Sequence, residues 1–590
     1  MNRVKLKPLP ATKHSQRNEY TSFYSRFKRK ISSLWHRSQI GHRSEYSVER
    51  LLAFRDYYQR TSLARAVVIC VVSPLPALLV ALAIDSIPLR PPSDGWRENY
   101  AVWIRLLLAI FAEALGVALQ VRGVIVPGAM SSTGAVIIAL GTAISSVLVT
   151  IAVAAMWKFP IPYGYVIMLN LYVLFFVIYM IFVLGPRALA SSPVLRQQIK
   201  SELFIMANQS GVAVAYPIFS AVFNYLSGIN QSLFIFVMPL IKCITKLNIA
   251  NSATSFHEYV GPIVVFSVDL FNVYYVAICM QASKSMSTTL ILMAFDGFHV
   301  LLALRAIFYR TNSVRASEVS VFENYLRDLP TLIRKEFESP AQSHDRRIRL
   351  FAPFPLPLSV DSKALMNELA RTGSFANDTA PCAIKVVNKT SLQVGPASSF
   401  NLKPPVPVQQ HHVAPANGHV EDPAQKFRPA SLPTTSTASS DDSIQDALQA
   451  LFHSEYVLLA EYVEFMVPIL YALYLAVLFH LEVAAYYPHT ATMTICKLKA
   501  TVTNILIYAV LEVIMFGALL ILLKRKFGFP PLYQLAFVLE SQAPAIQGHL
   551  FLWTISILHI TLVLILWFTF PSLNLQKKTL LLAYDVVLMN

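Results

Sequence analysis

The sequence predicts an all-α fold, a polytopic transmembrane helix bundle of about 10–12 spans. Composition is the first reason, since 55% of the 590 residues are hydrophobic and only 14% are charged. That balance would leave a soluble protein of this size short of polar surface. The second reason is a series of some eleven apolar stretches, such as 66–84 and 550–570. Each is close to the roughly 20 residues that span a hydrocarbon core.

The spacing of these stretches divides the chain into four parts. Residues 1–62 are a basic arm with an amphipathic and a juxtamembrane helix, and residues 63–308 are an eight-span block. Residues 309–442 are an insert without apolar periodicity. Residues 443–590 begin with an amphipathic helix and continue as a three-span block.

The arm is the most basic part of the chain: the first 65 residues hold fifteen Lys or Arg and four acidic residues. Four apolar side chains recur in it at helical spacing, with basic residues on the other faces, which predicts an amphipathic helix on an anionic inner leaflet. A disordered basic tail and an organellar transit peptide fit the same composition. The four apolar residues are Phe23, Phe27, Ile31 and Leu34.

Basic residues also follow the fourth, sixth, eighth and tenth stretches, as the positive-inside bias requires if the arm and the insert are cytosolic. No cleavable signal precedes the first stretch. The net charge of +16 is therefore assigned to contacts with anionic lipid headgroups and not to nucleic acid. The localisation predicted is an integral, multi-pass membrane protein with the N-terminus and the 309–442 insert in the cytosol.

The insert is rich in Pro, Ser and Thr, and eight of the 35 prolines lie between residues 395 and 440. Such a composition cannot bury a core, so we expect the insert to be largely disordered. It offers docking segments for cytosolic protein partners, and a plain spacer is the alternative.

Ionisable residues near the centres of four spans are the candidate functional groups. They are Glu113 in the second span, Asp269 in the seventh, Asp296 in the eighth and Glu512 in the tenth. A bare charge facing lipid costs at least about 2.5 kcal/mol, so these side chains must face one another, a partner or water.

Helical geometry groups some of these residues. Asp269 with Asn272, and Asp296 with His299, are each three residues apart and share a helix face. Lys242 in the sixth span is the expected counter-charge of these carboxylates. It lies about one helical turn deeper in the membrane than Lys246, which can snorkel to the inner interface.

Two interpretations of this polar set remain open. In the functional one, Asp269 and Asp296 bind a cation or carry protons, His299 relays a proton, and Lys242 neutralises the empty site. In the other, the same groups form a buried network that fixes helix register. Glu113 and Glu512 are assigned to the pathway too, although each can simply be protonated and hydrogen-bonded to a neighbouring helix.

Prolines interrupt two of the spans, Pro74 and Pro76 in the middle of the first and Pro239 in the middle of the sixth. Interrupted membrane helices free backbone groups that coordinate substrates or ions.

Motifs of soluble enzymes are missing: the chain has no P-loop, GxGxxG, GxSxG or HExxH, and its five cysteines show no paired spacing. No metal or cofactor is predicted. The best interpretation is a transporter or channel with a midplane polar site. The alternatives are a membrane scaffold or signalling protein that uses the arm and insert, and a membrane-embedded transferase.

Two passages carry a resemblance: Tyr46–Tyr58, which runs into Ser73-Pro74-Leu75-Pro76, and Val264–Asn272. They resemble uncharacterised polytopic membrane protein families expanded in oomycetes. The resemblance covers both membrane blocks and weakens in the arm and insert. It implies a polytopic fold, and it brings no functional residue with it.

Overall fold

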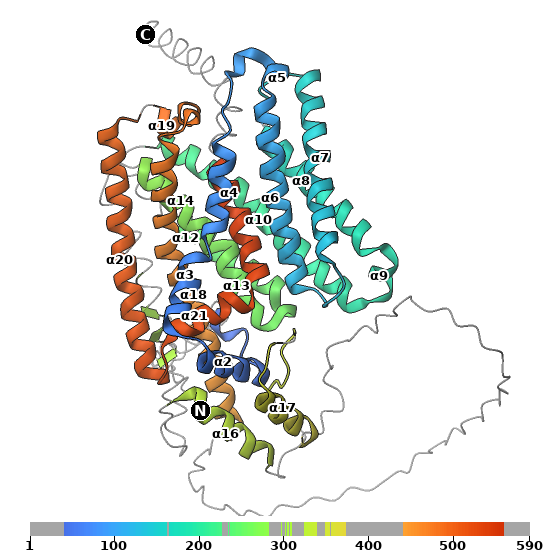
Figure 1. Cartoon of the computed structure of the whole chain (residues 1–590), viewed down its shortest axis with the longest axis vertical. Helices are drawn as coiled ribbons and strands as arrows, with labels where there is room; N and C mark the ends of the chain where they lie inside the picture. Colours follow the sequence, from blue (N-terminus) through green and yellow to red (C-terminus); the bar gives the residue numbers. More distant parts are fainter. Residues whose placement is uncertain are drawn as a thin grey trace, which may run out of the picture.

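The computed structural model describes most of the two membrane blocks and part of the insert. The described residues are 40–161, 164–226, 237–282, 324–338, 348–354, 356–372, 440–491 and 493–559, with a few single residues between 234 and 308. Within these ranges every regular element is a helix, and the long helices run side by side as an elongated bundle (Figure 1).

Seven segments of the described chain are long and apolar enough to cross a membrane. The chain is therefore an integral, multi-pass membrane protein with an all-α fold, as predicted. The total of 10–12 spans stays a prediction, because most of the eighth predicted span lies outside the described residues. The seven segments are Leu63–Asp85, Tyr100–Val124, Ser132–Met156, Gly164–Leu184, Val237–Ile278, Ile444–Leu478 and Ile495–Phe527.

The first span is broken as its prolines predict. Helix α3 (Leu63–Val72) ends just before Ser73-Pro74, and α4 (Leu75–Asp85) begins after it with Pro76 in its first turn. A proline ring has no N–H to donate and clashes with the preceding turn, so one straight helix cannot continue through this point.

Three apolar helices follow and pack in sequence at one side of the bundle (Figure 1). They are α6 (Tyr100–Val124), α7 (Ser132–Met156) and α8 (Gly164–Leu184). The longer α10 (Pro193–Tyr225) then crosses behind them. Short elements connect these helices or precede them: η1 (Ile40–His42), η2 (Pro92–Asp94), α5 (Gly95–Glu98) and α9 (Pro186–Ser191).

Helix α6 lies unusually close to the last described helix, residues 543–559. A Cβ atom added at Gly116 would lie 2.8 Å from the carbonyl oxygen of Gly548. Small residues at such a crossing let two membrane helices approach backbone to backbone.

The segment Val237–Ile278 folds back on itself and is not one straight span. Helix α12 (Val237–Ser252) enters the turn η3 (Ala253–Tyr259), where His257 has φ of 48°. The chain returns through α13 (Val260–Val264), one π-helical turn η4 (Val265–Asp269) and α14 (Leu270–Ala282). These two arms correspond to the predicted sixth and seventh spans.

The C-terminal block is built around α18 (Ser440–Leu478), which packs against α14, α4 and α20. Helix α20 (Ile495–Phe527) lies at the edge opposite α7 and α8 (Figure 1) and ends at Gly528, which has φ of 73°. The short η6 (Glu482–Tyr486) and α19 (Pro488–Ala491) connect the two, and α21 (Pro531–Ser541) leads into residues 543–559.

Part of the insert, which the sequence predicts to be largely disordered, forms helices. Helices α16 (Tyr325–Glu338) and α17 (Val360–Thr372) pack against α2 (Val48–Arg60) at one end of the bundle (Figure 1). The physical reason is an apolar face on α16, which buries Tyr325, Leu329 and Ile333.

The juxtamembrane helix α2, the ordered part of the insert and the basic end of α20 all lie at this same end (Figure 1). The predicted cytosolic location of that end stays a prediction. The amphipathic arm and the Pro-rich stretch fall in residues 1–39 and 373–439, outside the described residues.

Candidate functional site

Six ionisable side chains from four separate elements meet in the interior of the bundle. We call them the central charge cluster. They are Lys242 and Lys246 of α12, Asp269 of η4, Glu461 and Glu464 of α18, and Glu512 of α20.

Ion pairs connect the first half of this cluster. The Asp269 carboxylate lies 2.7 Å from Nζ of Lys246 and 3.4 Å from Nζ of Lys242. Lys242 also lies 3.5 Å from Oε1 of Glu464. The Asp269 side chain is fully buried, and those of Lys242 and Lys246 are only 13% and 19% exposed. Lys242 therefore bridges two carboxylates on different helices.

Three carboxylic acids form the second half of the cluster. Oxygens of Glu461, Glu464 and Glu512 all lie within 4.8 Å of one another, and all three residues are buried. Carboxylate oxygens at such distances suit a proton or a hard cation, which balances their like charges.

One member of the cluster, Glu512, lies near the middle of α20 along the helix axis. Glu512 follows Ile495, the first residue of α20, by 17 positions and precedes Phe527, the last, by 15. At 1.5 Å per residue it lies about 25 Å from one helix end and about 22 Å from the other.

Local backbone geometry at Asp269 is also unusual, because this residue ends the single π-helical turn η4. Isolated π turns are rare and occur often at functional sites. Two neighbours hold this turn through Ser267, whose hydroxyl lies 3.0 Å from Nε2 of Gln209 and 3.0 Å from Nε2 of His549.

The structure brings together three of the predicted site residues, Asp269, Lys242 and Glu512. Asn272 is buried one turn after Asp269. Asp296 and His299 lie outside the described residues.

Two other predicted residues, Pro239 and Glu113, are not members of the central charge cluster. Pro239 lies in the first described turn of α12, three residues before Lys242. Glu113 lies apart from the central charge cluster, in a cavity between α6, α8, α10 and residues 543–559.

The expectation that Lys246 snorkels to the interface is wrong. Its ammonium group contacts Asp269 and donates a hydrogen bond of 3.2 Å to the Tyr456 hydroxyl, so it has partners inside the bundle.

Glu461 and Glu464 were missed by sequence reasoning. They are three residues apart within an apolar run, so they share a helix face. That spacing is the signal that would have found them.

A second buried ionic group, the Arg50 cluster, lies at the end of the bundle near α2. It consists of Arg50, Arg349, Glu258 and Glu455. The Arg50 guanidinium lies 2.9 Å from both oxygens of Glu455, and Arg349 lies 2.7 Å from Glu258. The Tyr46 hydroxyl and the Ser47 N–H donate to the same two carboxylates.

Burial alone would lower the pKa of Arg50, but the negative charges of Glu455 and Glu258 outweigh it and raise that pKa. Arg50 is therefore permanently charged, and the Arg50 cluster is a fixed link between α2, η3, α18 and the insert. Of its four members, Arg50 lies within residues 46–58, and the other three lie far along the chain.

A third group surrounds Asp85 at the opposite end of the bundle. Asp85 accepts hydrogen bonds of 2.7 Å from the hydroxyls of Tyr474 and Tyr487, pairs with Arg105, and lies 3.2 Å from Nε2 of His559. This group links α4, α6, α18 and residues 543–559.

Comparison of the chain with models of known protein families, with curated proteins and with solved structures finds no match.

Proposed function

We propose that this protein is a transporter or channel for protons or small cations, with the central charge cluster as the exchange site. One observation carries the proposal. Among the described residues, the cluster joins four carboxyl groups to two ammonium groups in the middle of the bundle. Like charges that lie close together repel one another at that depth, so a set with more carboxyl than ammonium groups favours binding of protons or a cation.

Lys242 gives the cluster a way to exchange partners. It lies almost equally far from Asp269 (3.4 Å) and Glu464 (3.5 Å). A cation or proton that neutralises the Glu461, Glu464 and Glu512 group weakens the attraction of Glu464 for Lys242. The ammonium group then moves towards Asp269, and loss of the bound ion reverses the movement.

Purified protein in sealed vesicles tests the proposal. We expect a pH or cation gradient to drive flux through the wild-type protein. We expect Asp269→Asn and Glu512→Gln to reduce the flux to the background leak of empty vesicles. A matched control is Glu98→Gln, which removes an exposed carboxylate that pairs with Arg90 at the membrane end.

Wild-type flux that the two cluster variants leave unchanged would refute the proposal. No flux through the wild-type protein with any small cation or with protons would do the same. Turnover of a lipid-linked substrate in detergent, with no gradient present, would instead support the embedded transferase.

A further inference from the structure

The cavity that contains Glu113 is chemically different from the central charge cluster. It has a volume of about 110 Å³, and its walls come from α6, α8, α10 and residues 543–559. None of its lining residues is Lys or Arg, and most are apolar. No member of the central charge cluster lines it.

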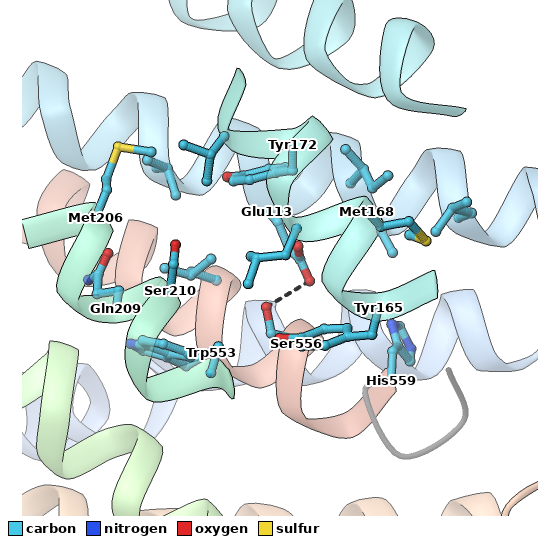
Figure 2. A pocket seen from close by; sticks show the side chains of 18 residues that line it. Glu113, Tyr165, Met168, Tyr172, Met206, Gln209, Ser210, Trp553, Ser556 and His559 are labelled. Atoms are coloured by element: carbon cyan, nitrogen blue, oxygen red, sulfur yellow. Dashed lines mark hydrogen bonds between the residues drawn. The ribbon is translucent and has the colours of Figure 1, made fainter. Parts of the chain in front are cut away.

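The cavity wall carries one carboxyl group, of Glu113, and three aromatic rings, of Tyr165, Tyr172 and Trp553. Figure 2 shows Glu113 facing Ser556, with Tyr165, Tyr172 and Trp553 around them. The Ser556 hydroxyl donates a hydrogen bond of 2.9 Å to Glu113. Glu113 lies near the middle of α6, where a carboxylate is costly without a cationic partner.

Two buried polar groups on the wall have no hydrogen-bond partner within the described part of the chain. They are the hydroxyl of Tyr172, which is 8% exposed, and the indole N–H of Trp553, which is 2% exposed. Buried polar atoms are normally paired. The Tyr172 hydroxyl oxygen can accept a hydrogen bond, so it indicates a donor supplied by a ligand, whereas the indole N–H can only donate and gives no such indication.

We propose that this cavity binds the head of a lipophilic amine, with the ammonium group on Glu113 and the adjoining carbon atoms among the aromatic rings. A carboxylate next to aromatic faces favours a cation over a neutral group of the same shape. The ammonium group has three N–H donors, which suit the Glu113 carboxylate and the hydroxyl oxygens of Tyr172 and Ser210.

The size of the cavity limits what it encloses. An apolar cavity of about 150 Å³ holds benzene, so about 110 Å³ holds the ammonium head and a few carbon atoms. Glu113, Tyr165 and Ser210 keep partial exposure, which leaves the ligand a way in and room for the rest of its body outside.

A matched ligand pair tests the proposal on the full-length protein in nanodiscs. We expect 2-phenylethylamine to bind at least about tenfold more tightly than 2-phenylethanol, because only the amine forms a charge-assisted hydrogen bond with Glu113. Glu113→Gln should reduce the affinity for the amine to that for the alcohol. The exposed-site variant Glu98→Gln should keep the preference.

A photoreactive diazirine analogue of the amine gives a readout that needs no variant. It should label residues of the cavity wall in the wild-type protein, among them Met168 and Tyr172, and excess unlabelled amine should prevent this. Equal binding of amine and alcohol, a preference that survives Glu113→Gln, or labelling confined to other helices would overturn the proposal. Because the cavity shares no residue with the central charge cluster, each result is independent of ion flux.

Discussion

The Arg50 cluster and the central charge cluster are two buried ionic groups that both have members on α18, and they differ in their ionisable groups. Glu455 and Glu464 are nine residues apart on α18, about 13 Å along its axis. The Arg50 cluster joins two guanidinium groups to two carboxylates. The central charge cluster joins two ammonium groups to four carboxyl groups.

This difference separates a structural role from an exchange role. Arginine stays charged and binds a carboxylate through two fixed hydrogen bonds, as Arg50 does with Glu455. Lysine is a mobile point charge, and neighbouring carboxyl groups exchange protons readily. We therefore expect substitutions in the Arg50 cluster to reduce stability, and substitutions in the central charge cluster to reduce transport.

The largest expected effect comes from Arg50→Met. Removing one partner of a buried ion pair leaves Glu455 uncompensated, which costs about 3–5 kcal/mol of unfolding free energy. Thermal unfolding in detergent should show a much lower transition temperature than for the wild-type protein. Arg50→Lys keeps the charge but loses the pair of hydrogen bonds to Glu455. Its unfolding temperature should therefore lie between those of Arg50→Met and the wild-type protein.

If Arg50→Met unfolded like the wild-type protein but lost ion flux, the distinction between the two clusters would be wrong.

A smaller change in stability is expected from the double variant Glu461→Gln and Glu464→Gln. The substitutions remove like charges whose oxygens lie within 4.8 Å of a Glu512 oxygen, so the unfolding temperature should equal or exceed that of the wild-type protein. Flux measured on the same preparation should fall to the vesicle background. A marked loss of stability would show that these carboxylates are structural.

The smallest effect is expected at Glu49, on α2 beside the Arg50 cluster. Burial raises its pKa above the ordinary 4.5, and the charge of Glu258 adds to this, while the N–H groups of Ala352 and Leu356 oppose it. Folding therefore favours the protonated form, so Glu49 contributes stability at low pH that is lost as the pH rises from about 4.5 through the raised pKa.

Glu49→Gln removes that contribution. Relative to the wild-type protein, we expect the variant to gain stability between pH 4.5 and neutral pH, as measured by unfolding temperature at several pH values. If the unfolding temperature changed with pH in the same way in both proteins, the raised pKa of Glu49 would be contradicted.

The sequence predicted the all-α membrane fold because lipid imposes one length and one composition on every span. It predicted Asp269, Lys242 and Glu512 as interior residues for the same energetic reason. It also predicted Lys242 as a counter-charge, and Lys242 pairs with Asp269. It did not predict the pairing of Lys246 with Asp269 or of Lys242 with Glu464, because these pairs depend on the helical hairpin at η3 and on which face of α18 points into the bundle. The Arg50 cluster was missed because its members are far apart in the sequence, with Arg50 and Glu455 separated by 405 positions, and show no local spacing.

The most direct test of the central claim is infrared spectroscopy of the reconstituted protein during a pH titration. We predict that adding a transported cation during the titration changes the carboxyl bands, and that this change is smaller in Glu512→Gln. A spectrum in which cations and Glu512→Gln leave every carboxyl band unchanged would show that the cluster exchanges nothing, and would contradict the account.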